Sequence, residues 1–238
     1  MWSSGRSEAS LEAGFPVPVE VRTIRNARRF RLRFDDSSGT LKLTCPPRTS
    51  RRKALAWALD QRDWIEGQIA RAEPTVPFEP GVIIPLEGMD TRLVWSERLP
   101  RTPLLKGSEL HCGGPASGYA RRIEAFLKRR ALEVMSQEAA EYAAAAGSGI
   151  RSVSVGDAGS RWGSCSSQGR IRLSWRLILA PPDVRRYVVA HEVAHLRHLD
   201  HGAEFKALEA RLFGAGVAAA KAELRRLGPR LRRLGRRS

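Results

Sequence analysis

The segment His191-Glu192-Val193-Ala194-His195 constrains the local fold more than any other part of the chain. Two histidines four residues apart lie on one face of an α-helix, because a helical turn takes about 3.6 residues. The preceding Pro181-Pro182-Asp183 supports a helix start, since proline suits the first turn and aspartate suits the N-terminal end. Apolar residues then recur at spacings of three and four. We therefore expect a helix with a partly apolar inner face that ends near residues 199–200.

The paired imidazoles of this segment are spaced to grip one metal ion. A tetrahedral zinc with three protein ligands leaves one position for water, and a glutamate beside the first ligand can take a proton from that water. The sequence therefore predicts His191 and His195 as ligands of one zinc ion per chain, with Glu192 as the general base. Another divalent metal is an alternative, and so is a surface helix with two solvated histidines.

The third ligand is expected from the segment that follows the helix. We predict His201, because Gly202 lets the chain turn back towards the metal. His198 is the first alternative, but it lies about 10 Å along the helix from His191 at a rise of about 1.5 Å per residue. One zinc with bonds of about 2.0–2.1 Å does not easily take all three histidines of a straight helix. Glu204 is a further alternative.

Four segments together resemble the YgjP-type metal-dependent hydrolases, which are relatives of SprT-like and other zincin metallopeptidases. The segments are Arg161-Trp162-Gly163-Ser164-Cys165-Ser166, Ile171 to Leu177, His191 to Leu196 and Asp200-His201-Gly202-Ala203-Glu204-Phe205. The resemblance covers roughly residues 17 to 215 and is strongest from 160 to 206. It implies a zincin-like fold in which His191, His195 and His201 bind the metal. It also implies that Glu192 is the catalytic acid and base.

Three further residues are predicted to contact the substrate. Arg161 and Trp162 precede a strand expected at residues 170–175, and an edge strand beside the metal helix can pair with an extended peptide. A structural turn with a core aromatic ring is the alternative for this pair. Tyr187 stands one helical turn before His191 and has a hydroxyl group that can donate to an oxyanion, although packing is its alternative role.

The order of the expected elements predicts an α+β fold. It has a zincin-like lobe with a long helix, a small sheet and the metal-binding active-site helix, preceded by a β-rich N-terminal lobe. A hairpin is expected at residues 29–45, one helix at 50–72 and the long helix at 119–146. Composition divides the chain into four parts: a disordered N-terminus at 1–15, the β-rich lobe with one helix at 16–117, the zincin-like metal-binding lobe at 118–218 and a basic C-terminal tail at 219–238.

The net charge of +16 favours anionic partners. Between residues 221 and 237 the chain carries eight basic residues and a single acidic one, Glu223. Such a run is typical of a solvated tail, and a nucleic-acid or other polyanion contact is the alternative. The leucines within it recur at three or four, which also allows a short amphipathic helix near Gly228-Pro229.

Composition excludes several other classes of protein. No apolar run is long enough to span a membrane, and three widely spaced cysteines form neither a disulfide framework nor a cysteine zinc site. The N-terminal residues lack the apolar core of a signal peptide, which favours a cytoplasmic location.

Three functions fit these features. The first is a zinc metallopeptidase acting on peptides. The second is a nucleotide (UTP-type) pyrophosphatase using the same metal site, an activity that the family resemblance also implies. The third is a nucleic-acid-associated SprT-like protease or a basic binding protein.

Overall fold

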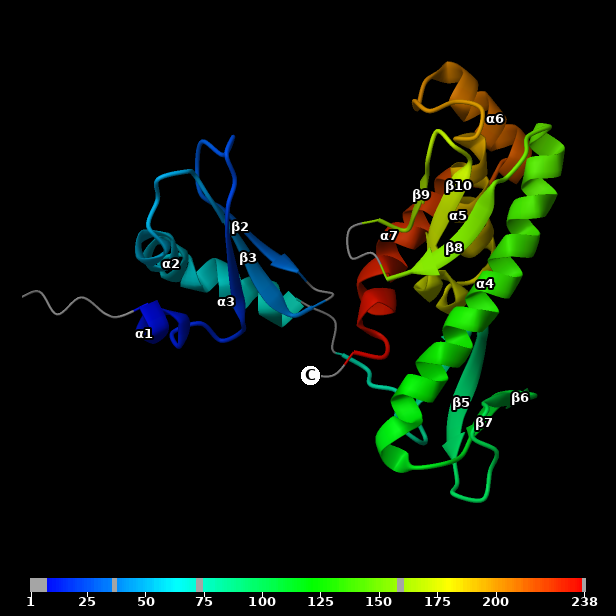
Figure 1. Cartoon of the computed structure of the whole chain (residues 1–238), viewed down its shortest axis with the longest axis horizontal. Helices are drawn as coiled ribbons and strands as arrows, with labels where there is room; N and C mark the ends of the chain where they lie inside the picture. Colours follow the sequence, from blue (N-terminus) through cyan, green and yellow to red (C-terminus); the bar gives the residue numbers. More distant parts are fainter. Residues whose placement is uncertain (1–7, 36–37, 72–74, 158–160, 237–238) are drawn as a thin grey trace, which may run out of the picture. The chain divides into compact units, whose positions relative to one another are not determined.

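The computed structural model describes residues 8–35, 38–71, 75–157 and 161–236 (Figure 1). The chain divides into two compact units, Met1–Pro74 and Thr75–Ser238, and each has its own hydrophobic core. Helices and short strands alternate in both units, so the predicted α+β class is confirmed. Among the described residues, no helix is both long enough and apolar enough to cross a bilayer.

The first unit is a three-stranded sheet covered by helices. Its strands are ordered β1-β3-β2, with β1 parallel and β2 antiparallel to β3. Leu41, Leu43, Leu55 and Ile65 are fully buried in its core. The elements are α1 (Glu8–Glu12), β1 (Val19–Thr23), β2 (Arg31–Asp35), β3 (Thr40–Cys45), α2 (Arg51–Leu59) and α3 (Arg62–Arg71).

Two expectations for this unit differ from the structure. The single helix expected at residues 50–72 is divided into α2 and α3, because the chain turns at Asp60-Gln61 between them. Of the segment 1–15 that we expected to be disordered, residues 1–7 lie outside the described residues. Residues 8–12 form α1, and Leu11 is buried against the core. The hairpin expected at residues 29–45 is confirmed as β2 and β3.

The second unit contains two small sheets and a long central helix, α4 (Tyr119–Ala146). One sheet has the order β4-β5-β7-β6 and the other β8-β10-β9. Their strands are β4 (Ile83–Leu86), β5 (Met89–Trp95), β6 (Leu104–Lys106), β7 (Glu109–Cys112), β8 (Ser152–Gly156), β9 (Gly163–Cys165) and β10 (Arg170–Ser174). The helices are η1 (Ala116–Gly118), η2 (Trp175–Leu179), α5 (Pro182–Ala194), α6 (Ala203–Phe213) and α7 (Val217–Arg233).

The expected lobe boundary at residue 117 differs from the division at Pro74 and Thr75. The sheet formed by β4 to β7 buries Ile84 and Leu93 in the same core as Ile123 and Leu127 of α4. A β-sheet and a helix that share one hydrophobic core belong to one unit. Residues 75–117 are therefore part of the same unit as the candidate metal centre. Proline and glycine in this stretch mark turns rather than a linker.

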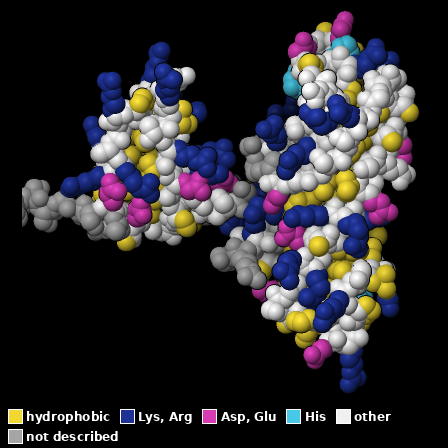
Figure 2. Space-filling model, viewed as in Figure 1, with side chains coloured by type: hydrophobic (Ala, Val, Ile, Leu, Met, Phe, Trp, Pro, Cys, Tyr) yellow, Lys and Arg dark blue, Asp and Glu magenta, His cyan; other side chains and the backbone are white. Residues whose placement is uncertain are grey.

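The expected tail at residues 219–238 is instead largely a helix of this unit. Leu231 and Leu234 are buried, and the buried guanidinium of Arg176 donates hydrogen bonds to both of their carbonyl groups. Leu234 also pairs with Val76 in a parallel bridge. The basic run therefore packs through its leucines, and Lys and Arg side chains are spread over the visible face of both units (Figure 2).

Candidate metal centre

Helix α5 carries the histidine motif and begins as the sequence predicts, with Pro182 at its first position and Asp183 in its first turn. It ends earlier than expected, at Ala194, with His195 as the C-terminal cap. The backbone then makes a tight turn in which the N–H of His198 donates to the carbonyl of Ala194. This turn brings the following segment back over the helix.

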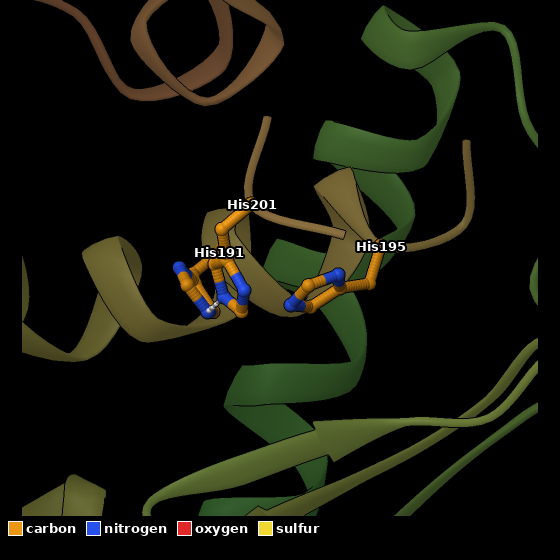
Figure 3. A group of neighbouring side chains, drawn as sticks. All are labelled: His191, His195 and His201. Carbon is orange, nitrogen blue, oxygen red and sulfur yellow. Dashed lines mark hydrogen bonds between the residues drawn. The ribbon is translucent and has the colours of Figure 1, made fainter. Parts of the chain in front are cut away.

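The structure brings His191, His195 and His201 together (Figure 3). One potential ligand atom from each ring lies within 4.8 Å of the others, and the Nε2 atoms of His191 and His201 are 3.3 Å apart. His198 lies outside this group, since its Nδ1 is 3.4 Å from Glu204 Oε2. The side chains of both alternatives for the third ligand, His198 and Glu204, thus contact each other.

Two of the rings are oriented by acceptors behind them. The Nδ1–H of His191 donates to Glu209 Oε1 at 2.7 Å, and the Nδ1–H of His195 donates to the carbonyl of His198 at 2.9 Å. Neither oxygen can donate, so in the neutral rings the Nε2 atoms are the acceptors, and that of His191 faces the Nε2 of His201. Burial keeps the pKa of His191 below its ordinary value, although Glu209 opposes this shift. Converging imidazole nitrogens with such support fit a zinc-like divalent cation.

Glu209 is a site residue that sequence analysis did not identify. It lies on α6, is 8% exposed, and shares the inner face of that helix with Phe205 and Leu208. Phe205 is buried, and its ring centroid is 4.5–5.0 Å from those of all three histidines. A carboxylate on an otherwise apolar helix face was the available signal, because such a group needs a buried partner.

Glu192 is 5% exposed and lies on the side of α5 that faces strand β9. Burial raises its pKa to about 7, and the positive charge of Arg161 opposes this shift. Gly163 on β9 makes room for the carboxylate, because a Cβ atom there would lie 2.4 Å from Glu192 Oε1. Gly163 is therefore a second site residue that sequence analysis did not identify, although its segment was part of the family resemblance.

The remaining predicted site residues occupy different surroundings. Arg161 is exposed just before β9, near enough to influence Glu192. Trp162 is half-buried under the guanidinium of Arg232, which lies 4.4 Å above its ring. Tyr187 is buried, packs edge-on against Phe213, and has a pKa raised to about 12 by burial. Its position favours packing over contact with a substrate.

Strand β9 is an edge strand of its sheet and packs beside α5. Among the described strands it pairs with β10 alone, so its other edge is available for a further strand. An extended chain that paired with this edge would pass Gly163 and therefore Glu192.

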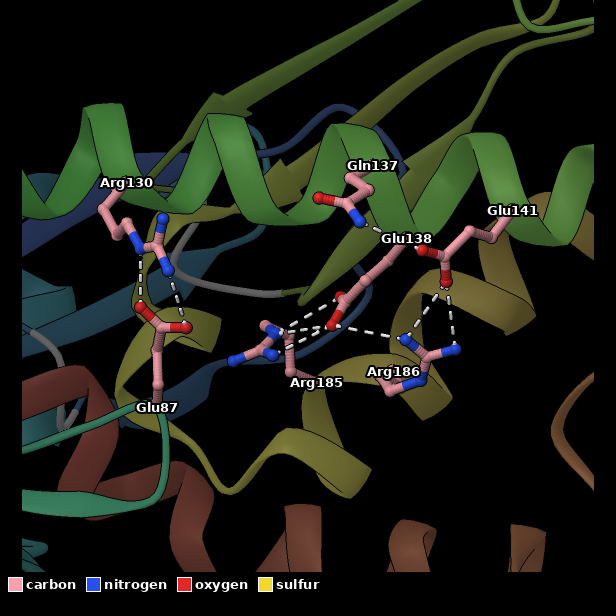
Figure 4. Close-up of polar contacts among 7 residues, drawn as sticks. All are labelled: Glu87, Arg130, Gln137, Glu138, Glu141, Arg185 and Arg186. Carbon is pink, nitrogen blue, oxygen red and sulfur yellow. Dashed lines mark hydrogen bonds and ion pairs between the residues drawn. The ribbon is translucent and has the colours of Figure 1, made fainter.

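Ion pairs hold α5 against α4 (Figure 4). The buried Arg185 forms three hydrogen bonds of 2.9–3.2 Å with the buried carboxylate of Glu138. Arg186, which is more exposed, contacts Glu141 at 3.3 Å. These contacts fix the position of α5 one to two turns before His191.

The second unit thus has the arrangement of metal-dependent hydrolases that carry His-Glu-x-x-His on a helix, with a third histidine from the chain that follows. The family model described as YgjP-like, metallopeptidase domain, matches residues 28–227. The chain therefore belongs to the YgjP-like metallopeptidase family, and the resemblance seen in the sequence is confirmed.

Two other comparisons gave less. A crystal structure of the metallopeptidase zymogen abylysin from Pyrococcus abyssi is similar at 19% sequence identity and a TM-score of 0.36. The match covers 42% of this chain and 97% of that chain. No curated protein matches the sequence.

Proposed function

We propose that the chain is a zinc-dependent peptidase in which His191, His195 and His201 hold the metal and Glu192 is the general base. One observation carries the proposal: three imidazoles converge, and Glu192, next to the first of them in the chain, is a buried carboxylate whose pKa is raised to about 7. Membership of a metallopeptidase family supports a hydrolytic reaction on peptides. Among the described residues, Glu209 is the other buried acid next to the histidines. Its carboxylate accepts a hydrogen bond from His191, so Glu192 is the better candidate for the base.

The protein and the metal have separate tasks in this proposal. When bound, a zinc ion would lower the pKa of water and polarise the carbonyl group of the scissile bond. Glu209 and the carbonyl of His198 hold the ligand rings in the tautomer that presents Nε2. Phe205 supplies an apolar wall behind the rings.

Glu192 has the properties of an acid and base that works near neutral pH. A carboxylate with a pKa of about 7 can take a proton from the attacking water and later deliver it to the leaving amine. Gly163 allows the carboxylate to lie against β9, where a peptide bound along the strand edge would present its scissile bond.

The ligand assignment is tested by metal content, measured by elemental mass spectrometry on zinc-loaded protein. We expect about one zinc per chain in the wild type, loss of zinc in His201→Ala, and retention in the matched variant His198→Ala. Zinc lost from His198→Ala and kept by His201→Ala would move the third ligand to His198.

The catalytic role is tested by hydrolysis of a peptide library. We expect Glu192→Gln to keep its zinc and to lose at least about a hundredfold in kcat/KM, because general acid–base catalysis contributes about 10²–10⁴-fold. Full turnover by this variant would refute the role. Assays with nucleoside triphosphates in parallel test the pyrophosphatase alternative, which no feature of the three-histidine group itself favours.

A further inference from the structure

A small cavity of about 250 Å³ lies beside the proposed active site. Its lining includes Arg161, Trp162, Gly163 and Ser164 from the β9 segment, Arg172 from β10 and Asp157 after β8. Arg172 is exposed between the buried Ile171 and Leu173, so it points away from the core face of the sheet. The cavity is therefore formed on the outer face of this sheet.

Two arginines, Arg161 and Arg172, belong to the lining of the cavity. Within the described part of the chain, neither Arg161 nor Arg172 forms a hydrogen bond or an ion pair. The Arg172 guanidinium lies over Gly156, because a Cβ atom at that glycine would be 2.6 Å from its Nη2. Arg161 lies near enough to Glu192 to affect its pKa, and Arg172 has no ion-pair partner among the described residues, so the lining favours binding of an anion.

Among the described lining residues, the carboxylate of Asp157 is already paired. Asp157 is 2.8 Å from Arg176 and 2.9 Å from Arg236. Burial would raise the pKa of Asp157, but the hydrogen bond and charge of Arg176, helped by Arg236 and Lys128, lower it overall. The charge of Asp157 is thus offset by its own partners, and the described lining keeps the positive charges of Arg161 and Arg172.

The cavity is connected to the catalytic residue through β9. Gly163 lines the cavity and lies beside Glu192, since a Cβ atom there would be 2.4 Å from Glu192 Oε1, and Arg161 from the same segment lowers the pKa of Glu192 against the effect of burial. Ser164 is the cross-strand partner of Arg172, and partners in one row point to the same face of a sheet. A peptide paired with the free edge of β9 would continue this row.

This register places one substrate side chain on the face of Arg172. Neighbouring strands lie about 4.8 Å apart, so the substrate residue would be about 10 Å from the Arg172 backbone. In the structure the Arg172 guanidinium lies over Gly156 of β8, on the side of β10 away from β9. It would turn back across the small Ser164 to meet a substrate carboxylate beside β9. The next substrate residues would alternate to the opposite face, towards Glu192 and the histidines.

We propose that this cavity is an anion subsite that binds an acidic group of the substrate close to the scissile bond. The inference rests on the proposed peptidase function. The guanidinium groups of Arg161 and Arg172 would donate hydrogen bonds to the oxygens of an aspartate or glutamate side chain. A phosphorylated side chain offers the same oxygen chemistry, and the experiment below separates the two sources.

The test uses matched peptides that differ at one position, carrying Glu, Gln, Lys or phosphoserine there. Cleavage sites of the zinc-loaded wild type in a peptide library, mapped by mass spectrometry, define the position. We expect the Glu peptide to exceed the Gln peptide by about tenfold in kcat/KM, which corresponds to about 1.4 kcal/mol. Arg172→Gln should remove this preference and Arg172→Glu should shift it to Lys. Arg170→Gln, an exposed arginine on the same strand outside the cavity lining, should keep it.

A binding measurement separates this inference from the proposed function. Fluorescence anisotropy with the zinc-loaded Glu192→Gln variant should give about tenfold tighter binding of the Glu peptide, lost when Arg172→Gln is added. If the wild type cleaves no peptide, the peptidase function is refuted, and the position is instead found by binding of the library to the same variant. Glu-dependent binding that Arg172→Gln removes would then keep the anion subsite. Cleavage with no Glu or phosphoserine preference, or with a preference unchanged in Arg172→Gln and Arg161→Gln, would overturn the subsite. A preference for phosphoserine alone would identify phosphate as its ligand.

Discussion

At the scale of single residues, the carboxylate of Glu192 has room because residue 163 is a glycine without a side chain. A Cβ atom at that position would overlap the glutamate carboxylate, which has little freedom to move because it is 5% exposed. The catalytic group is therefore positioned from a neighbouring strand and not by its own helix alone.

We expect Gly163→Ala to keep its zinc and its fold while kcat falls by about 10- to 100-fold, since small misplacements of a reacting group cost about 10²-fold. KM should change little if β9 still pairs with the substrate. Gly149→Ala is the matched control, because a Cβ atom there meets no atom within 4 Å. Normal kcat in Gly163→Ala would show that Glu192 tolerates the displacement.

Glu209 is the second residue whose effect is indirect. Its hydrogen bond to His191 fixes the ring, and partners of this kind are worth about 10- to 100-fold in metal affinity. We expect Glu209→Gln to weaken zinc binding by that factor in a chelator competition assay. Glu204→Gln should not, because Glu204 is exposed and its ion-pair partner among the described residues is His198, which lies outside the histidine group. Equal zinc affinity in wild type and Glu209→Gln would contradict this role.

At the scale of elements, the buried pair of Arg185 and Glu138 ties the metal-binding helix to the central helix. Removing one partner of a buried pair leaves an uncompensated charge, which costs about 3–5 kcal/mol. We expect Glu138→Gln to lower the free energy of unfolding by that amount in urea titrations. Arg186→Gln, which removes a more exposed pair, should cost less than about 1 kcal/mol. Similar small losses in both would show that α5 is held mainly by apolar packing.

Local elements were predictable from sequence where one signal decided them. The start of α5, the hairpin of β2 and β3 and the long helix α4 each follow from spacing, turn residues or apolar periodicity within a short window. The convergence of the histidines could be expected because all three lie within eleven residues. Glu209 and Gly163 act across elements, so their contacts with His191 and Glu192 depend on packing that no local pattern records.

At the scale of the whole second unit, the C-terminal segment was the least predictable part. The composition of an arginine-rich segment is compatible with a solvated tail and with a packed helix alike. The packing of this segment on the unit depends on Arg176 and Asp157, which are 55 to 79 residues from their partners in the chain. The same holds for the sheet of β4 to β7. The proline and glycine residues of its turns suggested a lobe boundary in the sequence. The hydrophobic core that it shares with α4 places this sheet in the second unit.

The ion pairs of Asp157 make the stability of this unit depend on acidity. Arg176 and its neighbours lower the pKa of Asp157 in the folded state below the ordinary value. The stabilisation is therefore complete above the unfolded-state pKa of about 3.9 and is lost as the pH falls through the lower folded-state pKa. We expect the melting temperature to fall over this acidic range by more in the wild type than in Asp157→Asn. Parallel pH profiles for the two proteins would contradict this expectation.

The bridge between Val76 and Leu234 has a consequence for how the second unit can be connected to other chains. Backbone partners are neighbours in space, so the chain enters and leaves this unit at adjacent points. A unit with adjoining termini can be inserted as a whole into a surface loop of another protein. It also suits circular permutation, in which the two ends are joined and new ends are made in another loop, while the core stays intact.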